Sequence, residues 1–383
     1  MEAYLDNSAT TRPCPEAAEA VRQALETGWH NPSALYRPAL EAQKAMERAR
    51  ALCLNAAGAP GQRLVFTGSG TEADNLAILG TLRTVRQPGR VLFLQSEHPA
   101  VSACMLEAER LHFVCEPMAV DRAGVCDLEK LDKQLSDDVR LICVMQVNNE
   151  VGAVQPLAAV AALRDRLCPG AAIHVDGVQG FLRVPLAFNR LGIQSYAFSG
   201  HKIHAVKGIG GLIVRKDHKL QPVVFGGGQE GGLRSGTENT PGIAALAAAV
   251  SAFPPDAPAR MAALKRRLWE GLKAAVPAAV LNGPAPDSEA AAPHILNVSL
   301  PPVRSQTMLF ALEGDGVWVS AGSACASHKQ KLSPVLSAMG LAPQLADCAL
   351  RFSLGADTDE QMIDHAVSCA AKQYAVLSRY VRR

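Results

Sequence analysis

Polar and ionisable side chains follow five short apolar segments of the chain, at the points where those segments end. The apolar segments have the length and composition that favour buried β-strands. In a sheet of parallel strands separated by helices, ligands bind beyond the carboxyl ends of the strands. We therefore expect the side chains that follow these strands to converge on one site. They lie in the segments Thr67–Glu72, Gln95–Pro99, Asn148–Glu150, Asp176–Gln179 and Ser199–Lys202.

The segment Thr67–Glu72 has the residue types of a phosphate-binding turn. Ser69 and Glu72 have the spacing of a helix capping box, and the helical sequence ADNLAILG follows them. Glycines permit close approach of the backbone, and the free N–H groups of a helix N-terminus bind phosphate. A plain capped helix would have the same sequence, so these residues alone leave both interpretations open.

Lys202 and Asp176 indicate which cofactor would carry that phosphate. A carbanion next to an amino group needs an electron sink, and pyridoxal phosphate provides one through a lysine Schiff base. The protein must then supply an acid for the pyridine nitrogen and a cup for the phosphate, and Asp176 and the Ser69–Thr71 turn are suitable for these tasks. The alternative is that Lys202 is a surface lysine and Asp176 a turn residue.

Bulk composition excludes several classes of protein. The 383 residues include 38 Lys+Arg and 36 Asp+Glu, so the net charge of +2 shows no footprint for nucleic acid or an anionic membrane. The ten cysteines are too sparse for a disulfide scaffold and form no CxxC pair, so we expect no metal site. The start, MEAYLDNSATT, lacks the basic and apolar regions of a secretory signal. We expect a cytoplasmic protein in a reducing compartment.

The alternation of strands and helices predicts an α/β fold with two domains. From about residue 60, apolar runs alternate with helical patterns such as Val101–Phe113 and Leu157–Leu167, which indicates a mostly parallel sheet flanked by helices. The alternation stops at the proline-rich segment Ser251–Pro258, and a strand-like segment, Ile295–Leu300, lies beyond it. We expect a large α/β domain over residues 15–253 and a smaller α+β domain formed by residues 1–14 and 254–383.

Nine motifs, in order along the chain, resemble those of the cysteine desulfurases, which belong to the class V aminotransferase superfamily of fold-type I pyridoxal phosphate enzymes. Each motif is short, but nine in order are specific. This resemblance implies the fold-type I transferase architecture and pyridoxal 5′-phosphate as cofactor. The motifs run from residue 4 to residue 355 and read YLDNSATT, FTGSGTEADNLAI, SEHPAV, VNNEVGAVQP, HVDGVQ, SGHKIHAVKGIGGL, GGGQEGGLRSGTENT, GSACAS and LRFSLG.

The resemblance, carried over residue by residue, implies the cofactor contacts. Lys202 would form the Schiff base and carry protons, Asp176 would face the pyridine nitrogen, and Gln179 would donate a hydrogen bond to the phenolic oxygen. His98 would stack on the ring and help to transfer protons. Thr237 would reach the phosphate from the neighbouring subunit, which implies a homodimer. The other residues expected to hold the phosphate are Gly70, Thr71, Ser199 and His201.

The resemblance also implies the reaction, which is the conversion of L-cysteine to L-alanine. Asn149 and Arg351 would bind the substrate carboxylate, for which a planar guanidinium is suited. Cys325 matches the nucleophile that accepts sulfur as a persulfide, and the nearby His328 and Lys329 add positive potential that favours a thiolate. The sulfur would pass to an acceptor such as an iron–sulfur scaffold protein or another thiol protein, for cluster assembly or thiolation.

Other functions of the same fold stay open. They are selenocysteine lyase, cysteine sulfinate desulfinase and class V transaminase. A non-catalytic assembly scaffold is a further alternative, against which the intact Lys202, Asp176, His98 and Cys325 argue.

The chain departs from the family pattern at four positions. The family often has NPSSxHxxG near the N-terminus, whereas Tyr36 and Ala39 replace the histidine and the glycine here. The glycine loop often reads HGGGHExGxRSGT, and Phe225 and Gln229 stand at its two histidine positions. Because the cofactor residues all match, we expect these changes to tune activity rather than to abolish it.

Overall fold

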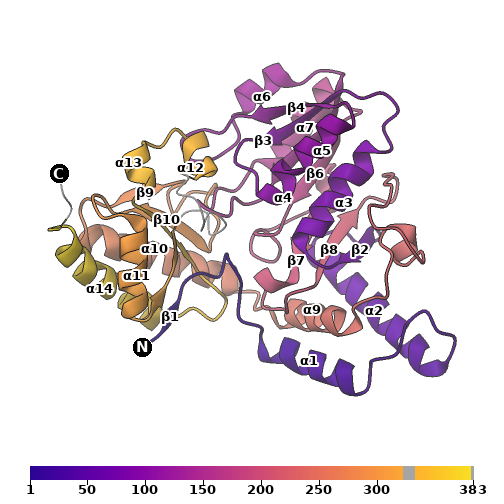
Figure 1. The fold of residues 1–383 in the computed structure, drawn as a ribbon, viewed down its shortest axis with the longest axis horizontal. Helices are drawn as coiled ribbons and strands as arrows, with labels where there is room; N and C mark the ends of the chain where they lie inside the picture. Colours follow the sequence, from indigo (N-terminus) through magenta and orange to yellow (C-terminus); the bar gives the residue numbers. More distant parts are fainter. Residues whose placement is uncertain (322–332, 381–383) are drawn as a thin grey trace.

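The computed structural model describes residues 1–321 and 333–380, which form two lobes that each contain a β-sheet (Figure 1). The larger lobe has a seven-stranded sheet of order β2-β8-β7-β6-β5-β3-β4, in which β8 is antiparallel to both neighbours and the other pairings are parallel. This is the mostly parallel sheet predicted from the sequence. Its strands are β2 (Arg63–Thr67), β3 (Arg90–Leu94), β4 (Val114–Met118), β5 (Val139–Met145), β6 (Ala172–Asp176), β7 (Ser195–Ser199) and β8 (Gly210–Val214).

Helices cover both faces of this sheet, and its strands are therefore buried on both sides. Alternate strand residues point to opposite faces, and the two neighbours Leu64 and Val65 accordingly belong to different hydrophobic clusters. One face packs against α3 (Gly70–Leu82), α4 (Pro99–Ser102) and α5 (Cys104–Arg110). The opposite cluster includes side chains of α1 (Pro15–Glu26), α2 (Arg37–Ala56), α6 (Leu128–Gln134), α7 (Leu157–Leu167), α8 (Phe188–Leu191) and α9 (Thr240–Ala252).

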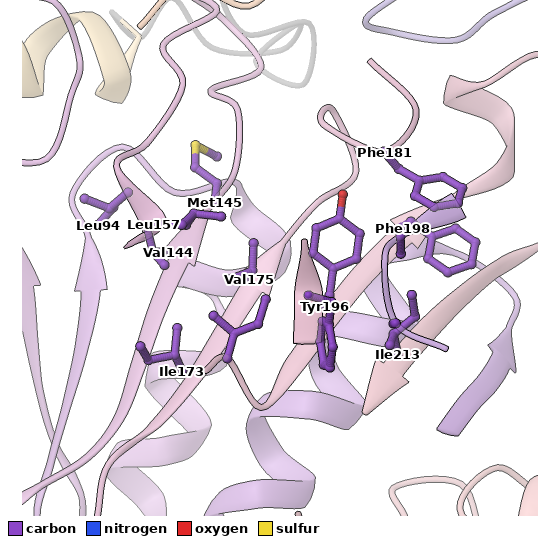
Figure 2. Close-up of a cluster of buried hydrophobic side chains, with 14 of the residues drawn as sticks. Leu94, Val144, Met145, Leu157, Ile173, Val175, Phe181, Tyr196, Phe198 and Ile213 are labelled. Atoms are coloured by element: carbon purple, nitrogen blue, oxygen red, sulfur yellow. The ribbon is translucent and has the colours of Figure 1, made fainter. Parts of the chain in front are cut away.

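Aromatic side chains pack at the centre of the large sheet, around strand β7 (Figure 2). Phe181 stacks on Phe198 of β7 with ring centroids 4.4 Å apart, and Tyr196 of the same strand is completely buried. The Tyr196 hydroxyl donates to Gln146 Oε1 over 2.7 Å. This packing fixes β7, which leads directly into the 3₁₀ turn η1 (Gly200–Lys202).

The smaller lobe is built on an antiparallel sheet of order β12-β13-β10-β9. Its own hydrophobic cluster joins this sheet to the apolar faces of three helices. The residues that α10 contributes to the cluster include Met261, Leu268 and Leu272. The elements are α10 (Ala257–Ala275), β9 (Val280–Asn282), β10 (Ile295–Ser299), α11 (Ser305–Gly314), β12 (Ser320–Ala321), β13 (Ala349–Ser353) and α14 (Glu360–Leu377). Two short helices, α12 (Pro334–Ala338) and α13 (Pro343–Ala346), lie where the lobes meet, and Leu336 packs in the large cluster.

The N-terminal segment passes from the smaller lobe to the larger one. It begins with β1 (Ala3–Tyr4), which pairs in parallel with β11 (Val317–Trp318), and Leu5 is buried in the small cluster. The backbone N–H of Thr11 then donates to the carbonyl of His201 over 2.9 Å. Residues 5–11 therefore run past the end of the large sheet.

The structure corrects the sequence analysis in three places. The predicted helical stretch Val101–Phe113 is divided into α4 and α5, which meet at Ala103. The edge strand β4 was not predicted, because its sequence VCEPM is largely exposed and carries a glutamate and a proline within the apolar run. The long helix α2 was also missed. By contrast, the predicted Leu157–Leu167 is α7 itself, and Ile295–Leu300 matches β10 to within one residue.

Replacing Tyr196 with Phe tests the polar anchor of β7. The change removes the donor to Gln146 Oε1, which lies in a buried residue, so we expect the free energy of unfolding to fall by about 1–3 kcal/mol. Equilibrium unfolding in urea measures it. The matched control is Tyr380→Phe, because Tyr380 is 78% exposed and its loss should have no effect. Equal stability of Tyr196→Phe and the wild type would contradict the assignment.

Candidate active site

A cavity of about 320 Å³ lies at the carboxyl ends of the large-sheet strands, a volume typical of sites for small ligands. Its walls come from both lobes and from the N-terminal segment, since Ser8, Ala9 and Arg351 join residues of the large sheet. Ser8, Ala9 and the buried Asp74 were not predicted from the sequence. The predicted residues that line the cavity are Gly70, Thr71, His98, Asn149, Asp176, Gln179, Ser199, His201, Lys202 and Arg351.

Lys202 lies on the 3₁₀ turn that follows β7, and its amine is held inside the cavity. Nζ donates to the backbone carbonyls of Ser8 and Ala9, the latter over 2.8 Å. Burial lowers the pKa of Lys202 to about 7, and the positive charges of Arg351 and Arg183 act in the same direction. A large fraction of this amine is therefore uncharged and nucleophilic near pH 7, as a lysine that reacts with carbonyl compounds requires.

Asp176 ends β6 and supplies a buried acid on the cavity wall. Its Oδ1 accepts the N–H of Val178 over 2.9 Å. Burial raises the pKa of Asp176, while the nearby His98 and Lys202 lower it. A buried carboxylate of this kind is stabilised by a positive partner, and a protonated pyridine nitrogen supplies that charge. The acid therefore fits the ring of pyridoxal phosphate.

The start of α3 forms the other end of the cavity and fits a phosphate group. Ser69 caps the helix, since its Oγ accepts the N–H of Glu72 over 3.1 Å. The Glu72 carboxylate does not complete a capping box with Ser69 but accepts the N–H of Gly68 instead, over 2.8 Å. A Cβ at Gly70 would stand 2.5 Å from Val178 Cγ2, so only glycine keeps this cradle open. The N–H groups of the first helical turn, together with the Thr71 hydroxyl, suit an anion.

Two further polar side chains of the cavity wall, those of His98 and Gln179, are uncharged near pH 7. Nδ1 of His98 accepts the N–H of Ala100 over 3.1 Å, and burial lowers the pKa of His98. Nε2 of Gln179 donates to the carbonyl of Ser8 over 3.0 Å, and its Oε1 accepts from Arg183 over 3.1 Å. These contacts orient both side chains before any ligand enters.

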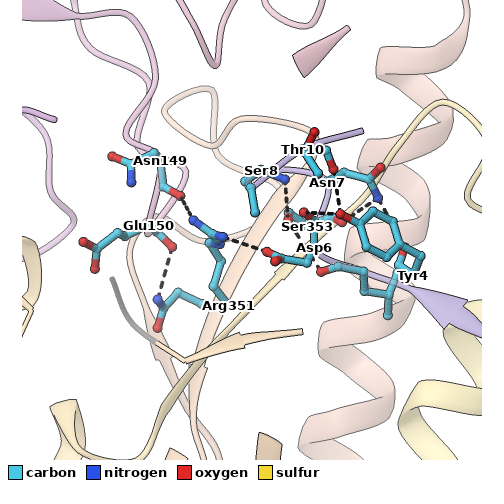
Figure 3. Close-up of polar contacts among 12 residues, drawn as sticks. Tyr4, Asp6, Asn7, Ser8, Thr10, Asn149, Glu150, Arg351 and Ser353 are labelled. Carbon is cyan, nitrogen blue, oxygen red and sulfur yellow. Dashed lines mark hydrogen bonds and ion pairs between the residues drawn. The ribbon is translucent and has the colours of Figure 1, made fainter. Parts of the chain in front are cut away.

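Arg351 of the smaller lobe lines the cavity, and Figure 3 shows its polar contacts. It projects from β13 with its side chain only 4% exposed, and Nη2 pairs with Asp6 Oδ1 over 2.7 Å. Nη1 donates to the carbonyl of Asn149 over 2.9 Å, while Nε is buried and has no hydrogen-bond partner among the described residues. The guanidinium thus keeps donor capacity for a carboxylate. Asp6 was not predicted as a site residue, although it lies two residues after β1 in the motif YLDNSATT.

Two predicted residues are not on the walls of this cavity. Thr237 lines a different hollow of about 160 Å³, together with Phe66 and Arg234. Cys325 lies outside the described residues. The nine cysteines within the described ranges are all free thiols, and no group of three or more metal-binding side chains occurs there. No helix in the described part of the chain is long and apolar enough to cross a membrane.

Replacing Lys202 with Met tests the burial of its amine in the cofactor-free protein. The pKa of Lys202 is about 7 when folded and near its ordinary 10.5 when unfolded, so between these values only the unfolded chain binds the proton. The buried Lys202 therefore lowers the free energy of unfolding by its full amount below pH 7. This loss becomes smaller as the pH rises toward 10.5. We expect Lys202→Met to exceed the wild type in stability most at low pH, and the difference to shrink as the pH rises.

Urea unfolding at a series of pH values measures that difference. The exposed Lys219→Met serves as the matched control and should give a difference that does not change with pH. A pH-independent difference for Lys202→Met as well would show that the amine is not desolvated.

Comparison with known proteins agrees with this geometry. The aminotransferase class-V family model matches residues 3–365. The cysteine desulfurases IscS of Salmonella schwarzengrund (strain CVM19633) and Escherichia coli O139:H28 (strain E24377A / ETEC) are each 37% identical over 379 residues, which cover 96% of this chain and 92% of theirs.

Solved structures give the same result. A NifS-like protein superimposes with a TM-score of 0.91 at 31% identity, over 98% of this chain and 100% of that one. SspA in complex with cysteine superimposes with a TM-score of 0.80 at 28% identity, over 92% of this chain and 98% of that one. The chain therefore belongs to the aminotransferase class-V family of pyridoxal phosphate-dependent enzymes, and within it to the cysteine desulfurases.

Proposed function

We propose that this enzyme converts L-cysteine to L-alanine and passes the sulfur through a persulfide on Cys325 to an acceptor thiol. The observation that carries the proposal is the convergence of a buried amine, a buried acid and a guanidinium on one cavity, from Lys202, Asp176 and Arg351. These are the groups that an amino acid and a pyridine ring require. The similarity to cysteine desulfurases, and to a protein solved with cysteine, supports cysteine as that amino acid.

The cofactor contacts in this proposal follow the chemistry of the cavity. Asp176 would hold the pyridine nitrogen, and the amide of Gln179 would donate to the phenolic oxygen. His98 would lie against the ring. The phosphate would sit at the start of α3, where the binding residues are Gly70, Thr71, Ser199 and His201.

Asn149 and Arg351 would bind the substrate carboxylate. The buried Nε of Arg351 supports this role, because it has no hydrogen-bond partner among the described residues and a carboxylate would satisfy it. When bound, the cofactor supplies an electron sink that stabilises negative charge at the substrate α-carbon. Lys202 would take the proton from that carbon, since its pKa of about 7 leaves a neutral amine available.

Sulfur transfer would follow at Cys325. Its thiolate attacks the substrate sulfur, the sulfur–sulfur bond forms, and the carbon–sulfur bond breaks with its electron pair moving to the substrate β-carbon. The two sulfur atoms of the new bond each lose one electron and the β-carbon gains two, and protonation of that carbon gives alanine. L-cysteine and the enzyme thiol thus become L-alanine and an enzyme persulfide, and no external oxidant is needed.

The proposal includes a homodimer, two domains and a cytoplasmic location. Thr237 would reach the phosphate of the partner subunit. An apolar groove of about 770 Å³ between α1, α2 and α9 supports the dimer, as do the nearby exposed Trp29 and Leu35. Residues 15–253 would bind the cofactor, and residues 1–14 and 254–383 would form the smaller domain. The free cysteines suit a reducing compartment, where an iron–sulfur scaffold or another thiol protein would accept the sulfur.

Replacing Cys325 with Ala tests the sulfur-transfer step. We expect the variant to bind pyridoxal phosphate with an unchanged visible absorbance band and to lose alanine formation from L-cysteine, because the substrate sulfur has no acceptor. Amino-acid analysis measures alanine, and Cys14→Ala is the control for loss of a half-buried thiol. Unchanged alanine formation by Cys325→Ala would contradict the mechanism. Retained activity on selenocysteine alone would favour the lyase alternative.

Replacing Arg351 with Met tests carboxylate binding. Hydrogen bonds to a charged group contribute about 1.5–3 kcal/mol, so we expect kcat/KM for L-cysteine to fall roughly 10- to 100-fold. Cysteamine, which lacks the carboxylate, should lose much less, so the preference for cysteine should shrink. Steady-state kinetics with both substrates measure this, and the exposed Arg304→Met is the control. An equal loss for both substrates would contradict the assignment.

A further inference from the structure

Arg183 is a buried cation next to the cavity that the proposed function does not use. Arg183 is only 2% exposed, and among the described residues its guanidinium donates to an amide oxygen and a backbone carbonyl rather than to a carboxylate. Burial lowers the pKa of Arg183 to about 9, so the guanidinium is still charged at pH 7. Because a buried charge without a counter-charge is costly, its position needs an explanation.

The guanidinium donates to two residues that the cofactor would contact. Nη1 donates to Gln179 Oε1 over 3.1 Å, and Nη2 donates to the backbone carbonyl of Lys202. An arginine has donors only, so whatever group faces it must be an acceptor. Arg183 therefore selects the amide orientation of Gln179 in which the oxygen points toward the guanidinium.

The opposite end of the Gln179 amide is then directed toward the cavity. Its Nε2 donates to the carbonyl of Ser8, which also accepts from Lys202 Nζ. His294, whose pKa burial also lowers, lies 3.4 Å from Gln179 Oε1 on the side of the guanidinium. A positive charge behind the oxygen of an amide polarises it and strengthens its N–H groups as donors.

We propose that Arg183 is a positioning residue, which holds the Gln179 amide with its N–H groups toward the cofactor and fixes Lys202 through its carbonyl. The inference deepens the proposed function, because it rests on the contact of Gln179 with the phenolic oxygen. The fixed charge of Arg183 also acts on Lys202, together with the charges of Arg351, Asp6 and Asp176.

A double-mutant cycle with Gln179 tests the positioning role. The dissociation constant of pyridoxal phosphate is measured by absorbance titration of apoprotein prepared from purified holoenzyme. We expect Arg183→Met to weaken binding by at least about tenfold. The effect should shrink in a Gln179→Leu background, where no amide remains to be oriented and only the contact of Arg183 with the Lys202 carbonyl is left. The exposed Arg190→Met is the matched control and should bind as the wild type does.

A second measurement separates positioning from a general loss of structure. The visible absorbance of the holoenzyme is followed against pH, and its midpoint reports protonation of the Lys202 nitrogen. Removal of a nearby positive charge makes protonation easier, so the midpoint should move to higher pH in the neutral Arg183→Gln and stay in the charged Arg183→Lys. These two milder variants also keep the test informative if Arg183→Met does not fold.

Two results would overturn the inference. One is additive effects of Arg183→Met and Gln179→Leu on cofactor binding. The other is a lowered melting temperature in Arg183→Gln with an unchanged absorbance midpoint, which would indicate a structural role only. Neither readout uses cysteine turnover. An enzyme that binds cofactor but makes no alanine would therefore contradict the proposed function and leave this inference standing.

Discussion

The desolvation of the Lys202 amine is the constraint on which the rest of the site depends. A lysine in water is fully charged at pH 7 and is a poor nucleophile, whereas burial lowers the pKa of Lys202 to about 7. The neighbouring cations Arg351 and Arg183 lower the pKa further, while Asp6 and Asp176 oppose them. The cavity therefore has to combine low solvent access with a balanced set of positive and negative charges around the amine.

The N-terminal segment provides much of that environment and links the two lobes. The carbonyls of Ser8 and Ala9 accept from the Lys202 amine, and two residues earlier Asp6 pairs with Arg351 of the smaller lobe. The N–H of Ser8 also donates to the Ser353 hydroxyl over 2.8 Å (Figure 3). One short segment thus sets the position of the amine and of the guanidinium together. A shift of the smaller lobe would therefore change the position of the Lys202 amine, because direct hydrogen bonds connect the two.

The sequence predicted the parts of the site that lie on regular elements. Lys202 and Asp176 follow buried strands, and the carboxyl ends of parallel strands meet at one edge, so their convergence could be inferred without coordinates. Asp6 and Arg183 could not be inferred, because both lie in irregular segments. Asp6 pairs with Arg351, which is distant in sequence, and Arg183 donates to the nearby Gln179 side chain and to the backbone carbonyl of Lys202. The edge strand β4 was missed for a related reason, since its half-exposed sequence lacks an apolar period.

We propose that the Lys202 amine is the group that reacts with the cofactor. Reduction of the holoenzyme with borohydride fixes the cofactor covalently to its lysine, and peptide mapping by mass spectrometry identifies the modified residue. We expect a single adduct on the peptide that contains Lys202, and none when Lys202 is replaced by Met. An adduct on another lysine of the wild type, or an unmodified Lys202 in protein that retains the visible absorbance band, would contradict it.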